Sequence, residues 1–219
     1  MILAALLLTV AGVPVVERLA TSAKTSDRFA VMITGDGGWK KIDERVTRAL
    51  RAEGVPVVGF VASEYFREER TPEQAANALE QVIRAYQKKW RKPNVILIGY
   101  SRGADALPFM ASRLPADIRD STKLVALLGL ESWIDFKYNP PWTIAHYVEH
   151  PKRFDVLPEA QKLRGMNVLC VYGEKEKDSL CPALDAKWFT IVRQRGGHHF
   201  AGRYDEVGSA IVSASARSR

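Results

Sequence analysis

The sequence predicts an α/β fold, in which helices cover both faces of a mostly parallel central sheet. Short continuous apolar runs alternate along the chain with amphipathic helical runs, which is typical of repeated strand–helix units. Continuous rather than alternating apolarity is typical of strands buried on both faces. Six segments are predicted as strands: 29–34, 55–61, 94–98, 123–130, 167–172 and 188–192.

The helices between these runs are marked by their spacing and end signals. The clearest begins with Thr71, Pro72 and Glu73, an N-cap followed by proline at the first helical position. Its apolar residues recur at helical spacing as far as Trp90 and give one inward face. Further helices are predicted over 42–53, 104–114 and 204–213. Pro108 falls inside the second of these three, where we expect a kink or a break.

Composition and charge narrow the class of protein. The chain has 219 residues, of which 47% are hydrophobic and 26% charged, as in an ordinary globular domain. These values exclude a disordered chain, a collagen-like repeat and a polytopic membrane protein. The net charge of +7 favours an anionic partner such as anionic lipid. No groove-reading motif is visible, so we expect no nucleic-acid partner. No stretch of about 18 uncharged apolar residues follows residue 17, so we expect at most a peripheral membrane contact.

Residues 1–12 are set apart from the predicted domain, which spans 13–219. This segment, MILAALLLTVAG, has the length of a signal-peptide core but lacks a basic start. A remnant of a secretory signal, a clipped fragment of a larger protein and a frayed edge strand of the fold are the alternatives, and export is preferred.

A candidate nucleophile lies between a predicted strand and a predicted helix. The run Gly99-Tyr100-Ser101-Arg102-Gly103 has the pattern G-x-S-x-G. In a nucleophile elbow a serine occupies a strained turn, and the glycines leave room beside it. We therefore predict that Ser101 is a nucleophile, with free N–H groups at the helix start facing a developing oxyanion. The alternative is a glycine-rich turn with an idle serine.

A serine nucleophile needs a base and an acid, which in the α/β-hydrolase order follow it as acid and then histidine. His198 follows the last predicted strand directly after two glycines, so it is preferred as the base over His199. The acid is expected in the loop after the strand at 167–172. Asp178 is preferred there, and Glu176 is the alternate.

The glycine-rich turn after the first predicted strand is expected to complete an oxyanion hole. It offers the backbone N–H groups of Asp36 and Gly37, and Arg102 offers its own next to the serine. Four residues near these loops are predicted to contact the substrate: Asp36, Trp39, Asp105 and Glu131.

The stretch 131–157 interrupts the strand–helix rhythm. It holds six aromatic residues and three prolines without a clean period. A lid or substrate wall and an irregular loop packed on the sheet edge are equal alternatives. Neither a metal-ligand spacing nor a cofactor motif occurs in the sequence, so no metal or cofactor is expected.

Four motifs, taken in order, resemble the bacterial virulence protein VirJ family, which includes the C-terminal domain of AcvB proteins. The resemblance covers the chain from about Val13 to Ser213. It implies an α/β-hydrolase fold and, residue by residue, a triad of Ser101, Asp178 and His198. Arg102 departs from many relatives, but that position contributes its backbone N–H. The motifs are GDGGW at 35–39, GYSRGAD at 99–105, EKDSLCP at 176–182 and GGHHF at 196–200.

The resemblance also implies a function at the cell envelope. AcvB-type members are associated with hydrolysis of lysyl-phosphatidylglycerol, an aminoacylated membrane lipid, and VirJ is linked to type IV secretion. We expect a periplasmic serine esterase that acts on a small ester or on an anionic phospholipid. The alternative is a periplasmic binding protein that works with secretion-system proteins without obligatory catalysis.

Cys170 and Cys181 are eleven residues apart. In a cytosolic enzyme both would be buried thiols. In an exported protein the spacing lets a strand residue meet the loop that follows it. For the exported protein we predict a disulfide that anchors the loop carrying the acid.

Overall fold

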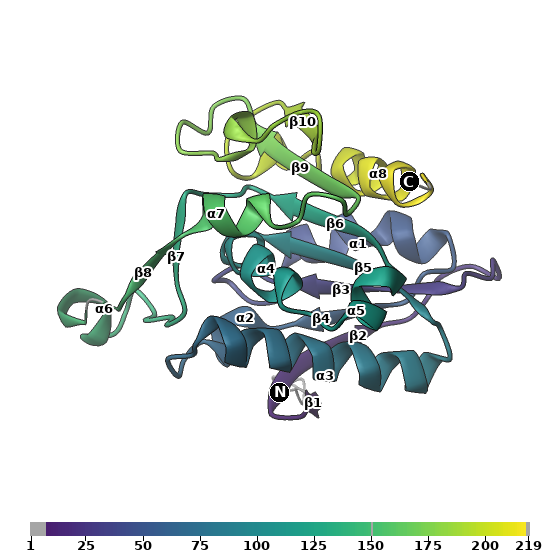
Figure 1. Ribbon diagram of the computed structural model, residues 1–219, viewed down its shortest axis with the longest axis horizontal. Helices are drawn as coiled ribbons and strands as arrows, with labels where there is room; N and C mark the ends of the chain where they lie inside the picture. Colours follow the sequence, from purple (N-terminus) through teal and green to yellow (C-terminus); the bar gives the residue numbers. More distant parts are fainter. Residues whose placement is uncertain (1–7, 150, 218–219) are drawn as a thin grey trace, which may run out of the picture.

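An eight-stranded sheet forms the centre of the computed structural model, which describes residues 8–149 and 151–217, and helices cover both faces of the sheet (Figure 1). The strands are ordered β1-β2-β4-β3-β5-β6-β9-β10. The β1–β2 and β2–β4 pairs are antiparallel, and the other pairs of this sheet are parallel. The predicted fold class, an α/β fold with a mostly parallel sheet, is therefore confirmed.

The six predicted strands are present, each with ends within two residues of the predicted run. Their burial is nearly continuous in the middle of the sheet, because helices lie on both sides. The strands are β3 (Arg28–Ile33), β4 (Val57–Phe60), β5 (Asn94–Tyr100), β6 (Thr122–Leu128), β9 (Val168–Gly173) and β10 (Thr190–Gln194).

Two groups of helices cover the sheet. On one face lie α1 (Lys41–Ala52) and α8 (Tyr204–Ser215). The other face carries α2 (Ala62–Tyr65), α3 (Pro72–Trp90), α4 (Arg102–Ser112), α5 (Ala116–Ser121) and α7 (Val156–Gln161). Along β5, Ile96 and Ile98 pack on the first group, whereas Val95 and Leu97 pack on the second. The alternation of side chains along one strand thus fills both cores.

Of the kink or break expected at Pro108, the break does not occur. Helix α4 runs from Arg102 to Ser112 without interruption. Its residues are buried continuously from Gly103 to Ala111, so tertiary packing offsets the hydrogen bond that proline removes.

The sheet begins before the predicted domain start at Val13. Strand β1 (Leu8–Val10) pairs with β2 (Val13–Arg18) through Leu8 and Val15. The rest of the apolar segment, residues 1–7, lies outside the described residues. Within the part of the chain that the structure describes, no helix is long and apolar enough to cross a bilayer.

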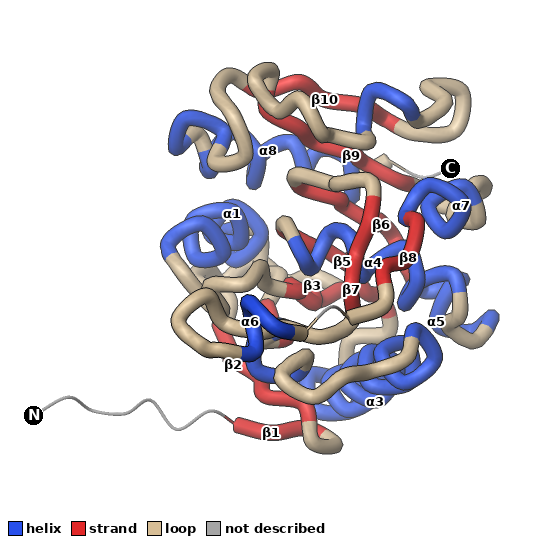
Figure 2. The backbone as a smooth tube through the Cα atoms, turned by 90° about the vertical axis from the view of Figure 1, so that its left-hand side faces the viewer, coloured by secondary structure: helices blue, strands red, loops and turns tan. Residues whose placement is uncertain are grey.

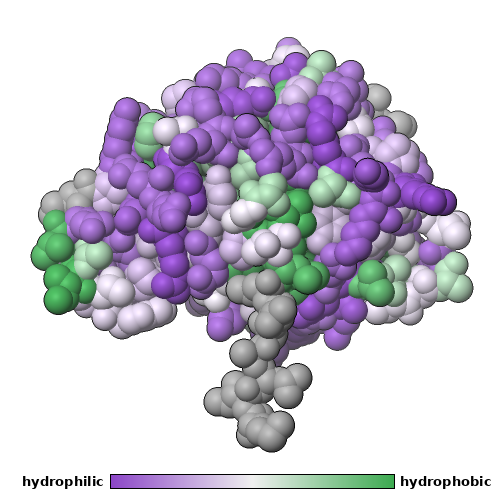
Figure 3. All heavy atoms as spheres, turned by 90° about the horizontal axis from the view of Figure 1, so that it is seen from below, coloured by the Kyte–Doolittle hydropathy of each residue, from purple (hydrophilic) through white to green (hydrophobic). Residues whose placement is uncertain are grey.

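The irregular stretch 131–157 forms a ribbon that projects from the body. Strands β7 (Trp133–Asp135) and β8 (Arg153–Asp155) pair antiparallel outside the main sheet. Beyond them the short helix α6 (Ala145–Val148) lies at the far end (Figures 1 and 2). Figure 3 shows hydrophobic side chains gathered at the same end of the molecule. The ribbon starts after the carboxyl end of β6, the edge of the sheet where Ser101 also lies.

Candidate active site

Ser101 occupies a strained turn between β5 and α4. Its φ of 53° and ψ of −126° are rare for a residue with a side chain. A Cβ on Gly99 would lie 2.3 Å from the carbonyl oxygen of Gly103, and one on Gly103 would lie 2.2 Å from that of Ile33. Both flanking positions therefore require glycine, as a nucleophile elbow does.

A small cavity of about 150 Å³ opens beside Ser101. The backbone N–H of Ser101 donates to the carbonyl of Leu128 at 2.9 Å, which fixes the turn against β6. The cavity is rich in acidic side chains. Its lining residues are Asp36, Ser101, Arg102, Asp105, Glu131, Trp133, Ile134 and Asp135.

The turn after β3 lies against the serine. A Cβ on Gly35 would lie only 3.2 Å from Cβ of Ser101, so glycine allows this close approach. Among the described residues, the backbone N–H groups of Asp36, Gly37 and Arg102 donate to no acceptor. These three amides, the ones predicted for an oxyanion hole, are therefore available to a ligand.

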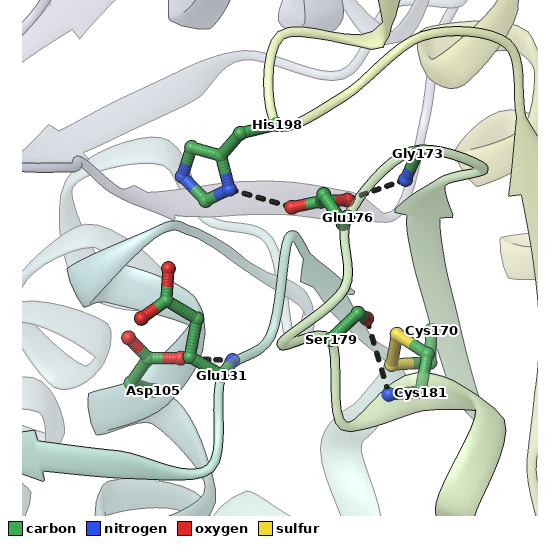
Figure 4. The surroundings of a disulfide bond; sticks show 8 residues. All are labelled: Asp105, Glu131, Cys170, Gly173, Glu176, Ser179, Cys181 and His198. Carbon is green, nitrogen blue, oxygen red and sulfur yellow. Dashed lines mark hydrogen bonds and ion pairs between the residues drawn. A yellow bond between two sulfur atoms is a disulfide. The ribbon is translucent and has the colours of Figure 1, made fainter.

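His198 is paired with Glu176 at the same edge of the sheet. Nδ1 of His198 lies 2.6 Å from Oε1 of Glu176, whose side chain is only 9% exposed (Figure 4). The other carboxylate oxygen of Glu176 accepts the backbone N–H of Gly173. The hydrogen bond with Glu176 raises the pKa of His198 because it stabilises the imidazolium, against the opposing effect of burial.

The preference for Asp178 as the acid is corrected by this geometry. The backbone turns directly after β9, where the N–H of Glu176 donates to Gly173 O at 2.9 Å, and the Glu176 carboxylate points to the imidazole. Asp178 lies two residues further on, and its side chain is exposed. The alternate acid, Glu176, is the partner of His198.

The preference for His198 over His199 agrees with the contacts. His199 is exposed, and its Nδ1 lies 2.8 Å from the hydroxyl of Tyr100 rather than near a carboxylate. Tyr100 also packs beside the ring of His198, with the two centroids 5.3 Å apart.

Gly129 is a site residue that the sequence analysis missed. A Cβ there would lie 2.8 Å from Cε1 of His198, and its φ of +67° also favours glycine. Gly129 follows Leu128, the acceptor for the N–H of Ser101, so one short segment contacts both predicted catalytic residues. Within the described residues, no hydrogen bond joins the Ser101 hydroxyl directly to His198. The signal that could have found Gly129 is a lone glycine directly after an apolar strand.

Two acidic residues link the halves of the site. Glu131 lines both the cavity at Ser101 and a second cavity at His198. Its backbone N–H donates to Oδ1 of Asp105 at 2.7 Å (Figure 4). Burial raises the pKa of Asp105 well above its usual range. Asp105 thus lines the cavity but also holds the backbone of Glu131 in place.

Arg102 connects the turn after β3 to the projecting ribbon. Its guanidinium forms ion pairs with Asp36 and, at 2.9 Å, with Asp135, and it lies 5.4 Å from the ring centre of Tyr138. The Arg102 side chain is only 15% exposed. Asp36, predicted as a substrate contact, therefore already has a cation beside it. Asp135 was not predicted as a site residue from the sequence.

Trp39 is not part of the site, contrary to the prediction. Its ring lies over Gly59 of β4, where an added Cβ would be 2.4 Å from the indole. Its Nε1 donates to Glu44 of α1 at 3.1 Å. The absence of a side chain at Gly59 makes room for the indole, so Trp39 packs between sheet and helix instead of facing Ser101.

The predicted disulfide is present and anchors the loop that carries Glu176. Cys170 of β9 and Cys181 of the short turn η1 (Cys181–Ala183) are both buried, with Cα atoms 5.7 Å apart (Figure 4). The loop is held again before Cys181, because Leu180 N donates to Leu130 O at 2.8 Å. In the described part of the chain, no group of three or more metal-ligating side chains is positioned to hold a metal ion.

The strand order and the strained serine define the class as the α/β-hydrolase fold, and solved structures agree. TT1662 from Thermus thermophilus is 17% identical and has a TM-score of 0.63, covering 97% of this chain and 98% of that chain. XC6422 from Xanthomonas campestris, described as an α/β serine hydrolase without lid, is 16% identical with a TM-score of 0.60, covering 92% and 87%. Est1E from Butyrivibrio proteoclasticus is 14% identical with a TM-score of 0.61, covering 96% and 98%.

The family follows from the sequence itself. The model of the bacterial virulence protein VirJ family matches residues 27–219, and the chain belongs to this family. A search of the curated proteins finds no match.

Proposed function

We propose that this protein is a serine hydrolase that cleaves esters, with Ser101 as nucleophile, His198 as base and Glu176 as the residue that orients the base. The observation that carries the proposal is the strained backbone of Ser101 at the same sheet edge as a hydrogen-bonded imidazole–carboxylate pair. The similarity to XC6422, which is described as an α/β serine hydrolase, supports the same chemistry.

In the first step the Ser101 hydroxyl attacks the carbonyl carbon of the ester, and Nε2 of His198 takes its proton. Glu176 accepts from Nδ1, which fixes the tautomer and stabilises the imidazolium that forms. The oxyanion is stabilised by the free backbone N–H groups of Arg102 and of the turn at Asp36 and Gly37. The alcohol leaves with the proton from His198, and an acyl-serine remains.

In the second step a water molecule attacks the acyl-serine, and His198 takes a proton from it. Collapse of the tetrahedral intermediate releases the carboxylic acid and returns the proton to Ser101. The missing hydrogen bond between Ser101 and His198 is compatible with these reaction steps, because such contacts often tighten only when substrate binds.

The charges around Ser101 favour a cationic acyl group. The carboxylates of Asp36, Asp105, Glu131 and Asp135 line the cavity, and Arg102 is the one cation among its lining residues. Even with Asp105 protonated, because burial raises its pKa, the cavity keeps an excess of negative charge. An ammonium group beside the ester would be stabilised there.

Together with the resemblance to AcvB proteins, this charge makes an aminoacyl ester of an anionic phospholipid, such as lysyl-phosphatidylglycerol, the proposed substrate. A periplasmic location goes with it, because disulfides such as Cys170–Cys181 persist in oxidising compartments.

The test of the nucleophile is labelling by a fluorophosphonate probe, which requires an activated serine. We expect the purified protein to be labelled and to hydrolyse small esters, and Ser101→Ala to lose both while keeping its circular dichroism spectrum. A folded Ser101→Ala variant with full esterase activity would contradict the proposal. Absence of labelling in the unmodified protein would favour the binding role over catalysis.

The substrate class is tested by comparing a lysyl ester with a neutral acyl ester of similar size. Glu131→Gln should lower kcat/KM for the lysyl ester by about tenfold more than for the neutral ester, since it removes one carboxylate from the cavity. The matched control is Glu174→Gln, an exposed residue of the neighbouring loop. Equal losses on both esters would refute the cationic preference.

A further inference from the structure

An exposed apolar cluster lies at the far end of the projecting ribbon. It consists of Trp142, Ile144, Tyr147 and Val148, whose side chains are 78%, 80%, 72% and 64% exposed. We call these four residues the tip. The tip forms the hydrophobic end of the molecule visible in Figure 3, at the place where Figure 1 shows α6.

The tip is separate from the core, although the base of the ribbon that carries it is well packed. Phe136 and Phe154 of the ribbon contact each other with ring centres 5.5 Å apart, and Phe136 also contacts Phe109 of α4 at 5.4 Å. The base of the ribbon is therefore fixed to the body, while the tip side chains gain little from burial within the chain. Concentrated exposed hydrophobic residues of this kind usually mark a contact surface.

We infer that the tip inserts into the interfacial region of an anionic lipid bilayer. The mixture of Trp, Tyr and aliphatic side chains suits the boundary between headgroups and acyl chains, where amphipathic aromatic rings are favoured. A narrow end of four side chains is well shaped to enter that layer. It is too small to supply the roughly 800 Å² per partner of an ordinary protein interface.

The charges beside the tip agree with an anionic surface. Arg153 begins β8, the strand that leads back from the tip, and Lys152 directly precedes it. Neither has a carboxylate partner among the described residues, and each lies over an aromatic ring instead. Glu149, the acid nearest the tip helix, already forms an ion pair with Lys137 at 3.8 Å and accepts a hydrogen bond from Asn139. With the net charge of +7, these cations favour negatively charged lipid.

The ribbon also connects the tip to the active-site region. A cavity of about 560 Å³ lies along it and is lined by Trp133, Tyr138, Pro141 and Arg153 among others. This cavity shares Asp36, Arg102, Trp133 and Asp135 with the cavity at Ser101. If the tip is inserted in the membrane, the cavity that leads along the ribbon to Ser101 lies level with the lipid headgroups. The binding itself does not require Ser101 to be catalytic.

The experiment measures cosedimentation of the purified protein with vesicles of phosphatidylcholine alone or mixed with phosphatidylglycerol. We expect binding to the mixed vesicles, weakened by added salt. The double variant Trp142→Ser/Ile144→Ser should bind at least about tenfold more weakly, since burial of one large apolar side chain is worth roughly that factor or more. Both residues are so exposed that the substitutions should leave the thermal midpoint unchanged.

The matched control is Leu19→Ser. Leu19 is 64% exposed but follows the end of β2 that pairs with the start of β4, at the opposite edge of the sheet from Ser101. This variant should bind like the unmodified protein. Hydrolysis of a small water-soluble ester should be equal in all three proteins, which separates membrane contact from catalysis.

Equal binding of the tip variant and the unmodified protein would overturn the inference, as would binding that ignores phosphatidylglycerol. Absence of vesicle binding would also overturn it. If sedimentation equilibrium then showed self-association that the tip variant loses, the tip would be a contact between copies of this chain instead.

Discussion

Two segments border the candidate active site, one at the cavity beside His198 and the other at the cavity beside Ser101, and they are held in opposite ways. The loop from Glu174 to Cys181 is tied by the disulfide, by backbone bonds on both sides and by the contact of Glu176 with Gly173. The ribbon from Trp133 to Asp155 is fixed at its base, but its far end is exposed.

Because of this difference, the two segments are suited to different tasks at the same site. An acid that orients a base must keep its geometry within a fraction of an ångström. Its loop is therefore cross-linked, and hydrogen bonds within the protein hold its backbone in place. A segment that meets a substrate or a surface needs exposed side chains and benefits less from rigidity. Substitutions in the loop should therefore affect turnover, whereas substitutions in the ribbon should affect recognition.

The largest effect is expected for the acid. Glu176→Gln should lower kcat for a small neutral ester by roughly 10³- to 10⁴-fold, because an amide no longer stabilises the imidazolium or fixes its tautomer. Asp178→Asn, in the same loop but exposed, is the matched control and should stay within about twofold. Steady-state kinetics of the two variants decide the assignment, and a larger loss in Asp178→Asn would reverse it.

The elements that the sequence predicted best depend on neighbours along the chain. The six strands and the strand–GYSRG–helix turn are local patterns, and the clash distances at Gly99 and Gly103 show why no other residue fits. Cys170 and Cys181 were paired for a similar reason, because their separation of eleven residues suits a strand and its following loop.

The errors fall where the outcome depends on contacts distant in sequence. Asp178 and Glu176 are both carboxylates of the same loop, and the contact that distinguishes them is the one between Glu176 and His198, 22 residues further along the chain. Trp39 looked like a pocket residue because it follows the glycine-rich turn, but the space above Gly59 on another strand receives it. A carboxylate three residues after a strand-ending glycine is the local signal that could have favoured Glu176.

The second effect concerns the cross-link of the loop. Replacing both cysteines, Cys170→Ala/Cys181→Ala, should destabilise the fold by about 3 kcal/mol, the loop-entropy value for a ring of this length. Urea unfolding measures it as a lower midpoint. Below the transition, kcat should also fall, since the loop that holds Glu176 loses its anchor. Unchanged stability together with unchanged kcat would mean that the remaining backbone bonds suffice.

A smaller effect is expected at Arg102, which connects the ribbon to the turn after β3. Arg102→Met keeps the aliphatic stem but removes the ion pairs with Asp36 and Asp135. We expect kcat for a neutral ester to fall by about tenfold, because the turn that supplies an oxyanion donor is no longer held. Arg48→Met breaks an ion pair with Asp205 on the exposed side of α1 and serves as the control. Equal kinetics for both variants would show that the turn after β3 keeps its position without the ion pairs of Arg102.

The smallest effect is expected for the pH dependence of kcat/KM, on which the charge of Glu131 acts. His198 must be neutral to act as a base, so kcat/KM falls as pH drops through its pKa, which lies above the ordinary 6.5. The bond with Glu176 is the largest cause of the increase, and the negative charge of Glu131 adds to it. Glu131→Gln removes that charge and makes the imidazolium less stable. The acid limb for a neutral ester should therefore move to lower pH, by less than in any Glu176 variant that keeps measurable activity. A shift to higher pH would show that Glu131 does not act on His198 through its charge.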